Sequence, residues 1–343
     1  MLDDTAMIAL QGDTDSFRPK IGILSAHTER EKKLENKRLI EEITELGGDA
    51  RIVNYRRCAV GVLETGRALF QYDDDDHPVL VEVDAVIPRV GKFVESGVWV
   101  LQLLTSQGVY STASPDAVAT AKSKMSTHIA LDAHGVPTLY GIMPTGIRPK
   151  DPTETFKLLE SDPRRKLIVK TDRGSHGEGV LPPTPRRGAI ANAQAYRANS
   201  IRYIMQEFAE APHPDELASD VRIIVVENRI IGAMKRSAKD IGEFRSNISQ
   251  GGEGEPYEPT PREAELALRA CAVLNLDVGG VDIISSSRGS VVNEVNVSPE
   301  FGGIEGFTEA DIARHIAELA MKHAARRQPA EIASAQAVLM SGS

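Results

Sequence analysis

The stretch Gly279-Gly-Val-Asp-Ile-Ile-Ser-Ser-Ser-Arg-Gly-Ser-Val-Val-Asn-Glu-Val-Asn296 contains two apolar, β-branched runs with a turn-rich segment between them. This pattern predicts a β-hairpin. If Ser287-Arg288-Gly289 is a three-residue loop with Gly289 in the left-handed conformation, Asp282 lies opposite Glu294. Asn296 follows two residues later and therefore points to the same face as Glu294. The hairpin is thus expected to gather two carboxylates and an amide.

These three side chains predict a metal site. Like charges directly opposite each other in a ladder are destabilising, and a divalent cation would remove that conflict. Carboxylates and an amide carbonyl are the oxygen ligands that Mg²⁺ takes. The hairpin alone leaves an alternative open, in which the face is solvated and nearby lysine or arginine side chains hold its charges.

Composition limits the classes of protein to which the chain can belong. With 343 residues, 41% hydrophobic and 26% charged, it is long enough for two or three lobes of a soluble globular protein. It has no apolar run long enough to span a membrane, and Met1–Thr5 does not begin a secretion signal. The two cysteines suit a reducing cytoplasm, and Cys271 is expected to be a buried thiol. A net charge of −9 without a basic stripe argues against nucleic-acid binding.

The order of local signals predicts a small parallel α/β domain at residues 19–115, preceded by a flexible arm at 1–18. Strands are expected at 20–25, 50–54 and 84–88, with a helix over about 30–46. The acidic turn Asp73–His77 is interpreted as solvated rather than as a cation site.

Beyond residue 115, caps and strand signals continue to residue 326, and a disordered tail is expected at 327–343. Ser114 and Ser123 are predicted helix N-caps, and Thr260 with Glu263 predicts a capping box. A helix is expected at 308–323. Predicted strands cover 137–140, 166–170, 203–208, 221–226 and 229–234, the last two joined by the turn Glu227-Asn228.

A glycine-rich loop, Gly174-Ser-His-Gly-Glu-Gly179, follows the strand that ends at Lys170. Glycines let backbone N–H groups approach phosphates closely. The loop is neither a P-loop nor a Rossmann turn, because no Gly-Lys-Ser/Thr follows and the prolines after it cannot open a helix. Lys124, at a helix start, opposes the helix dipole, and an anionic ligand there would offset that cost. Taken alone, the loop could equally be a surface turn.

In this order, the motifs resemble those of the ATP-grasp ligases, most closely the RimK type, the ribosomal-protein α-L-glutamate ligases. The resemblance covers about residues 20–325. It rests on Val86-Ile-Pro-Arg-Val-Gly91, Lys124, Ile168-Val-Lys170 with the glycine loop, Met205-Gln-Glu-Phe208, Asp220-Val-Arg-Ile-Ile224, Phe244-Arg-Ser-Asn247 before Gly251-Gly252, Gly280-Val-Asp282 and Glu294-Val-Asn-Val-Ser-Pro299.

The resemblance implies an ATP-grasp fold of mixed α/β and α+β class. The small N-terminal domain would be followed by two α+β lobes that clamp ATP, a lid lobe at 116–200 and a C-terminal lobe at 201–326. ATP would phosphorylate a carboxylate, and an amine would then displace phosphate to form an amide. ATP and Mg²⁺ are the implied cofactors, with Mn²⁺ as a possible substitute for Mg²⁺.

The resemblance also implies residue roles. Lys170, Arg245 and Asn247 would act in catalysis, and Asp282, Glu294 and Asn296 would hold the metal. Phe208 stands where a tyrosine is common. The implied ATP-binding residues are Lys124, Lys170, Gly174, Ser175, Gly177, Gly179, Glu207, Phe208, Asp220, Arg245, Ser246 and Asn247. Among them, Glu207 and Phe208 would present their backbone to the adenine, and Asp220 would hold the ribose.

Substrate recognition is less defined. Arg89, Arg222 and Arg236 are candidates for binding substrate carboxylates. Glu300-Phe-Gly-Gly-Ile-Glu305 replaces the Gly-Leu-Glu-Gly typical of the ribosomal-protein enzymes, near the expected acceptor pocket. The leading hypothesis is therefore addition of L-glutamate to the C-terminal carboxylate of a protein or peptide, by a cytoplasmic homo-oligomer. A small-molecule or cofactor ligase is the second hypothesis, and a catalytically inactive nucleotide-sensing scaffold is the third.

Overall fold

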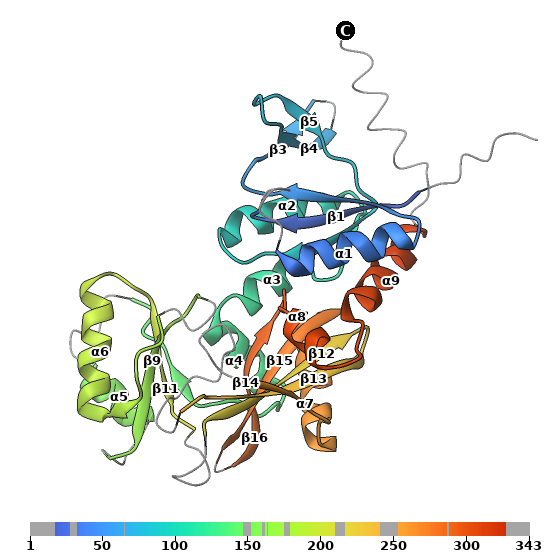
Figure 1. Cartoon of the computed structure of the whole chain (residues 1–343). Coiled ribbons are helices and arrows are strands. Elements are labelled where there is room, and N and C mark those ends of the chain that lie inside the picture. The colour runs from blue at the N-terminus through green and yellow to red at the C-terminus, as the bar shows by residue number, and fades with distance from the viewer. Residues whose placement is uncertain are drawn as a thin grey trace, which may run out of the picture.

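The computed structural model of the protein consists of a small N-terminal domain, a middle lobe and a C-terminal lobe (Figure 1). It describes residues 18–27, 33–64, 66–146, 152–159, 162, 164–174, 179–209, 217–240, 253–286 and 288–326. The arm predicted at 1–18, except Arg18, and the tail predicted at 327–343 lie outside the described residues. In the part of the chain that is described, no helix is both long enough and apolar enough to cross a bilayer.

The N-terminal domain is built on a parallel four-stranded sheet with the order β2-β1-β6-β7. The strands are β1 (Lys20–Ser25), β2 (Asp49–Asn54), β6 (Ala85–Arg89) and β7 (Tyr110–Ser111), and the helices are α1 (Leu34–Glu45) and α2 (Val94–Ser106). The central strand β1 is buried from Ile21 onward, as expected for a parallel strand covered on both faces. The strands predicted in this region are confirmed, and the helix predicted from about residue 30 begins at Leu34.

An antiparallel meander is inserted between β2 and β6, formed by β3 (Cys58–Leu63), β4 (Gly66–Tyr72) and β5 (Pro78–Leu80). The acidic turn after β4 is exposed to solvent. Asp73 Oδ1 accepts hydrogen bonds from the backbone nitrogens of Asp75 (3.0 Å) and His77 (2.8 Å). The interpretation of this segment as a solvated turn is confirmed.

Two consecutive helices, α3 (Pro115–Ala121) and α4 (Lys124–Ala133), lead out of the N-terminal domain. The hydroxyls of Ser114 and Ser123 accept hydrogen bonds from the backbone nitrogens of Ala117 and Ser126, so both predicted N-caps are confirmed.

The middle lobe contains the sheet β10-β9-β11-β8, whose outer face is covered by α5 and α6. Its elements are β8 (Gly141–Ile142), α5 (Thr153–Leu159), β9 (Lys166–Thr171), β10 (Thr184–Pro185), α6 (Arg186–Ala198) and β11 (Tyr203–Glu207). Because β11 pairs with β9, this sheet extends past the boundary predicted at residue 200.

The prediction of a strand at 137–140 is wrong. Thr138 forms only an isolated bridge with Val292, and β8 begins at Gly141. Pro137 has no N–H to donate to a ladder, and the hydroxyl of Thr138 donates to the carbonyl of Val292 at 2.9 Å.

The C-terminal lobe contains an antiparallel sheet of order β14-β13-β12-β15-β16. Its elements are β12 (Ser219–Val226), β13 (Arg229–Ser237), β14 (Glu253–Pro256), α7 (Pro261–Val273), β15 (Val278–Ser286), β16 (Gly289–Asn296), α8 (Gly302–Phe307) and α9 (Ile312–Ala324). The turn Glu227-Asn228 is confirmed, with both residues at positive φ (47° and 59°). The capping box of α7 is confirmed as well, since Thr260 and Glu263 accept each other's backbone N–H.

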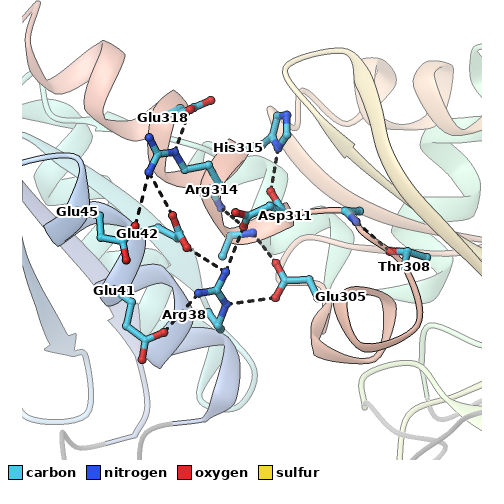
Figure 2. Close-up of polar contacts among 12 residues, drawn as sticks. Arg38, Glu41, Glu42, Glu45, Glu305, Thr308, Asp311, Arg314, His315 and Glu318 are labelled. Atoms are coloured by element: carbon cyan, nitrogen blue, oxygen red, sulfur yellow. Dashed lines mark hydrogen bonds and ion pairs between the residues drawn. The ribbon is translucent and has the colours of Figure 1, made fainter.

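A charged cluster joins the N-terminal domain to the C-terminal lobe (Figure 2). Arg38 on α1 forms ion pairs with Glu42 (2.9 Å), with Asp311 before α9 (3.2 Å) and with Glu305 on α8 (3.5 Å). Arg314 on α9 reaches back to Glu42 on α1 (3.4 Å). Helices α1 and α9, which lie side by side, are therefore bound by charges as well as by apolar contacts.

The three clusters of buried apolar residues do not coincide with the separate sheets. One cluster combines Leu24 and Val86 of the N-terminal domain with Val281 of β15, and another combines Ile21 with Ile316 of α9. The third cluster, with residues such as Phe156, lies within the middle lobe. The N-terminal domain and the C-terminal lobe thus share cores, whereas the middle lobe has its own.

Candidate functional site

The hairpin of β15 and β16 brings the predicted metal ligands to one face. Asp282 pairs directly with Glu294, as predicted, and Gly280 pairs with Asn296. Gly289 has the expected positive φ (90°). The predicted loop length is wrong, because Ser286 pairs with Gly289 at the turn. An irregularity between Ile283 and Asp282 then shifts the register by one residue and restores the expected pairing.

Asp282 is held by Arg222 of the adjacent strand β12 and by Arg236 of β13, the next strand in the sheet. Arg222 donates from Nε to Oδ1 (2.8 Å) and from Nη2 to Oδ2 (2.7 Å), and Arg236 Nη2 lies 2.9 Å from Oδ2. Arg236 also donates from Nε to Asp220 Oδ1 at 2.7 Å. Two carboxylates and two guanidinium groups therefore form a buried quartet, defined here as Asp220, Arg222, Arg236 and Asp282.

The quartet sets the protonation of its carboxylates. Burial disfavours the charge on Asp282, but Arg222 and Arg236 outweigh it and lower the pKa of Asp282 to about 2. Burial, together with the charge of Asp282, raises the pKa of Asp220 against the opposing effect of Arg236. Asp282 is therefore ionised at neutral pH.

The quartet also bears on the alternative reading of the hairpin. Arginines do hold the charge of Asp282, but in a buried environment rather than on a solvated face. For Arg222 or Arg236 to bind a substrate carboxylate directly, these ion pairs would have to open. Their substrate role, like the ribose role of Asp220, stays a prediction.

The lysines predicted to contact ATP lie beside the same face. Lys170, at the end of β9, is buried, and its pKa is lowered to about 8 by burial and then by the charge of Lys124, while Glu294 opposes the shift. Lys124 begins α4 and donates from Nζ to the carbonyl of Gly174 (3.4 Å) at the start of the glycine loop. The charges of Lys124 and Glu294 thus both act on Lys170, although the three residues come from three elements.

The described ends of the glycine loop are fixed to each other. Thr171 N donates to the carbonyl of Gly179 (2.9 Å), which also accepts from the hydroxyl of Tyr196 (2.8 Å). Gly179 has a φ of 67°, and an added Cβ would lie 2.6 Å from Thr171 Cγ2. Only glycine fits this position without strain. Ser175 and Gly177, also predicted to contact ATP, lie outside the described residues.

The predicted adenine-contacting segment, Glu207 and Phe208, lies at the end of β11. Glu207 Oε1 accepts a hydrogen bond from the backbone nitrogen of Tyr140 (2.9 Å) and pairs with Arg288. Arg288 in turn lies 3.8 Å from the centre of the Tyr140 ring. These contacts tie the end of β11 to the hairpin, while the adenine role of Glu207 and Phe208 stays a prediction.

Arg89 occupies the boundary between the N-terminal domain and the hairpin. Its Nη1 donates to the carbonyl of Pro299 (2.6 Å), and its guanidinium lies 5.6 Å from the centre of the Phe301 ring. Ser298 donates to the carbonyl of Pro88 at 3.1 Å. The segment that departs from the expected sequence after Pro299 is thus anchored to β6, and the substrate role of Arg89 stays a prediction.

Two residues at this site were not anticipated from the sequence. Asp172 is buried just after β9, and its Oδ1 accepts from the hydroxyl of Ser123 (3.0 Å) and from Met125 N (3.1 Å). It therefore fixes the start of α4 against the middle lobe. The pKa of Lys122, two residues before Lys124, is lowered to about 8, chiefly by burial, with the charge of Glu294 opposing the shift. The sequence feature that could have drawn attention to Lys122 was its position two residues before Lys124. Arg245, Ser246 and Asn247 lie outside the described residues, so their roles stay predictions.

Two family profiles match the chain from one end of the described region to the other. The RimK-like ATP-grasp domain matches residues 121–320, and the RimK PreATP-grasp domain matches residues 20–118. The chain belongs to the RimK-like ATP-grasp family. A relative in Hahella chejuensis, named "Probable alpha-L-glutamate ligase 2", is 34% identical over 304 residues, which are 88% of this chain and 95% of the relative.

Solved structures show the same fold at low sequence identity. The ATP-grasp ligase PsnB, solved with a minimal precursor, has a TM-score of 0.64 and 18% identity, covering 89% of this chain and 99% of PsnB. The D-cycloserine synthetase DcsG has a TM-score of 0.62 and 16% identity, covering 89% of this chain and 99% of its own. The predicted ATP-grasp fold and RimK resemblance are confirmed.

RimK-like ATP-grasp enzymes are carboxylate–amine ligases that use ATP and Mg²⁺, and this chain is an ATP-dependent ligase of that kind. The donor chemistry of the hairpin fits Mg²⁺, because Asp282 and Glu294 face each other and Asn296 Nδ2 lies 3.5 Å from Asp282 Oδ2. Across the described ranges, the hairpin included, no three His, Cys, Asp or Glu side chains converge as metal ligands, and the hairpin offers two carboxylates and an amide. We infer that these three residues would hold the metal, which would neutralise phosphate charge when bound.

Proposed function

We propose that this enzyme joins L-glutamate to the carboxylate of an acceptor, and that the acceptor is the C-terminus of a protein or peptide. The observation that carries the proposal is the 34% identity, across most of both chains, to the relative named "Probable alpha-L-glutamate ligase 2". Peptide acceptors gain support from the fold shared with PsnB, which has been solved with a precursor.

In the proposed reaction, an acceptor carboxylate oxygen attacks the γ-phosphorus of ATP, and the bond to the β–γ bridging oxygen breaks to release ADP. The uncharged amine of glutamate then attacks the carbonyl carbon of the acylphosphate. The carbon–oxygen bond to phosphate breaks, inorganic phosphate leaves, and the nitrogen loses a proton to solvent. One ATP is thus consumed for each amide formed.

The chain's own residues would act by position and charge. Both phosphoryl transfer and acyl transfer pass through states rich in negative charge, so placed cations lower the barrier. Lys124 and Lys170 are proposed to bind the phosphates, and Arg245 and Asn247 to contact the transferring group. The glycine loop would cover the acylphosphate, which water would otherwise hydrolyse. The quartet would keep Asp282 ionised and fixed in orientation.

Mass spectrometry of a cell extract tests the proposal directly. The extract is incubated with enzyme, ATP, Mg²⁺ and isotopically labelled L-glutamate. We expect the mass of a protein or peptide to increase by the mass of labelled glutamate residues. Glu294→Gln should abolish this increase, whereas Glu253→Gln, an exposed carboxylate on β14, should not. Incorporation of a different amine in preference to glutamate would refute the proposal.

A second candidate is a small-molecule ligase. It is supported by the fold shared with DcsG and by the Glu300–Glu305 segment, which differs from the ribosomal-protein enzymes beside the expected acceptor pocket. In the same experiment, labelled increments confined to low-mass metabolites would favour this candidate over a peptide acceptor.

A further inference from the structure

Arg288 lies in the turn that joins β15 to β16, at the tip of the hairpin that carries Asp282 and Glu294. Its backbone nitrogen donates to the hydroxyl of Ser286 (3.1 Å), and that hydroxyl donates to the carbonyl of Gly289 (2.8 Å). The Ser286 side chain therefore fixes the backbone of the turn. Arg288 is thus presented from a defined position at the end of two paired strands.

The guanidinium of Arg288 makes three contacts outside the C-terminal lobe. Its Nη2 donates to the carbonyl of Thr138 (3.3 Å) and forms an ion pair with the carboxylate of Glu207. The guanidinium carbon lies 3.8 Å from the centre of the Tyr140 ring. Arginine suits this combination, because its planar group can donate in its plane while its face stacks on an aromatic ring. The partners lie at the end of β11 and in the entry segment, defined here as residues 137–140, which leads into β8 of the middle lobe.

The partners of Arg288 are also joined to one another and to β16. Glu207 Oε1 accepts from Tyr140 N (2.9 Å), and Glu207 N donates to the carbonyl of Tyr140 (3.0 Å). On the other side, Val292 N of β16 donates to the carbonyl of Pro137 (2.9 Å). The entry segment is therefore held between β16 and β11, and Arg288 links the hairpin tip to both the segment and β11.

These contacts matter because the two lobes do not share an apolar core. In the part of the chain that the structure describes, the buried apolar cluster of the middle lobe contains no residue from the C-terminal lobe. A further tie, between Ser123 and Asp172, joins the middle lobe to α4 rather than to the hairpin. The position of the middle lobe against the hairpin is thus set to a large extent by polar contacts such as those of Arg288.

The groups predicted to bind one triphosphate are divided between these lobes. Lys170 lies on β9, which pairs with β11, whereas Asp282 and Glu294 lie on the hairpin. A single ligand can contact both sets only when the two sheets keep a definite separation and angle. If the enzyme populates that arrangement for only a fraction of the time, its apparent affinity for the ligand falls by the same fraction.

We propose that Arg288 is a positioning residue for the nucleotide. It holds the middle lobe in the orientation in which Lys170 and the metal hairpin reach the same triphosphate, and it acts through Glu207 and the entry segment rather than by contact with the nucleotide. The inference rests on the phosphate and metal roles proposed above, but not on the identity of the amine or of the acceptor.

The test measures binding of ADP in the presence of Mg²⁺ by calorimetry, together with the melting temperature of each variant without nucleotide. Arg288→Met removes the guanidinium. Glu207→Gln removes the charge with which it pairs, while keeping an oxygen that can accept from Tyr140 N. Arg262→Met is the matched control, because Arg262 pairs with Glu265 (2.8 Å) at the surface of the C-terminal lobe, within helix α7.

We expect Arg288→Met to bind ADP about 3- to 10-fold more weakly than wild type, the range for an exposed ion pair combined with a cation–π contact. Glu207→Gln should bind ADP about 2- to 5-fold more weakly. The double variant should bind it no more weakly than Arg288→Met alone, because both changes remove the same interaction. Arg262→Met should stay within about twofold of wild type.

A purely structural role for Arg288 would overturn the proposal: the melting temperature of Arg288→Met would fall while its affinity for ADP equalled that of the control. Losses that multiply in the double variant would also overturn it, because Arg288 would then not act through Glu207. If Arg288→Met does not fold, Tyr140→Leu provides the comparison with Glu207→Gln, since Tyr140 is 55% exposed and its ring is the stacking partner. ADP binding needs neither glutamate nor acceptor, so this proposal and glutamate transfer can fail separately.

Discussion

Replacing Arg222 by methionine should destabilise the enzyme by about 2 kcal/mol at neutral pH, through the loss of two charge-assisted hydrogen bonds to Asp282. The side chains of Arg222 and Asp282 are only 12% and 4% exposed, so solvent cannot replace these bonds. Arg236 remains 2.9 Å from Asp282, so the carboxylate keeps one partner. The loss should therefore fall below the roughly 3–5 kcal/mol expected for a buried charge left alone.

The pKa of Asp282 gives a related estimate, for both arginines set against the cost of burial. It is lowered from 3.8 to about 2, which corresponds to about 2 kcal/mol of net stabilisation of the ionised carboxylate. A carboxylate whose folded-state pKa is depressed contributes stability above its unfolded pKa and loses it as the pH falls through the folded pKa. The difference between wild type and the variant should thus be full at about pH 7 and shrink between about pH 4 and pH 2.

Urea unfolding followed by circular dichroism measures both effects. Arg229→Met, an exposed arginine on β13, provides the control and should change stability by less than about 0.5 kcal/mol. A double-mutant cycle with Asp282→Asn isolates the Arg222–Asp282 interaction. The reasoning is refuted if Arg222→Met is no less stable than the control, or if its deficit is unchanged near pH 3.

Three further predictions concern other parts of the fold. Gly179→Ala should destabilise the contact between Thr171 and Gly179 at the start and end of the glycine loop by about 1–3 kcal/mol, because the added Cβ would clash with Thr171. It should also reduce the increase in melting temperature that ATP induces. Gly146→Ala, where an added Cβ meets open space, should have neither effect. Cys271 should resist alkylation at about pH 8 until the protein unfolds, because burial raises the pKa of its thiol to about 12; rapid labelling in intact-mass spectra would contradict this. Arg38→Met should lower the urea midpoint by an amount equivalent to about 1–2 kcal/mol, and less at high salt; an unchanged midpoint at low salt would show that the charged cluster contributes nothing.

The parts of the fold that the sequence predicted are those set by short-range chemistry. The turn Glu227-Asn228 and the capping box of Thr260 and Glu263 depend on residues a few positions apart. The pairing of Asp282 with Glu294 was also predicted, although the loop assumed for it was wrong and a register shift compensates. Local patterns therefore predicted which residues share the hairpin face, but not the loop length and the register shift that place them there.

The features that the sequence did not predict depend on contacts across the fold. Nothing local indicates that Arg222 and Arg236 on adjacent strands hold Asp282, because that choice depends on how three strands pair. Helix α6 was missed because its buried residues, Ala189 and Ala193, are small and give a weak apolar signal.

The shared cores have a consequence for how the enzyme could be rebuilt. The N-terminal domain and the C-terminal lobe are separated in sequence by the middle lobe, yet they pack as one body and are joined again by the cluster of Arg38 and Arg314. The middle lobe, with its own core around Phe156, is in effect an insertion into that body. Exchange of the middle lobe between relatives should therefore leave both shared clusters intact, whereas a chimera joined near residue 115 would divide both of them.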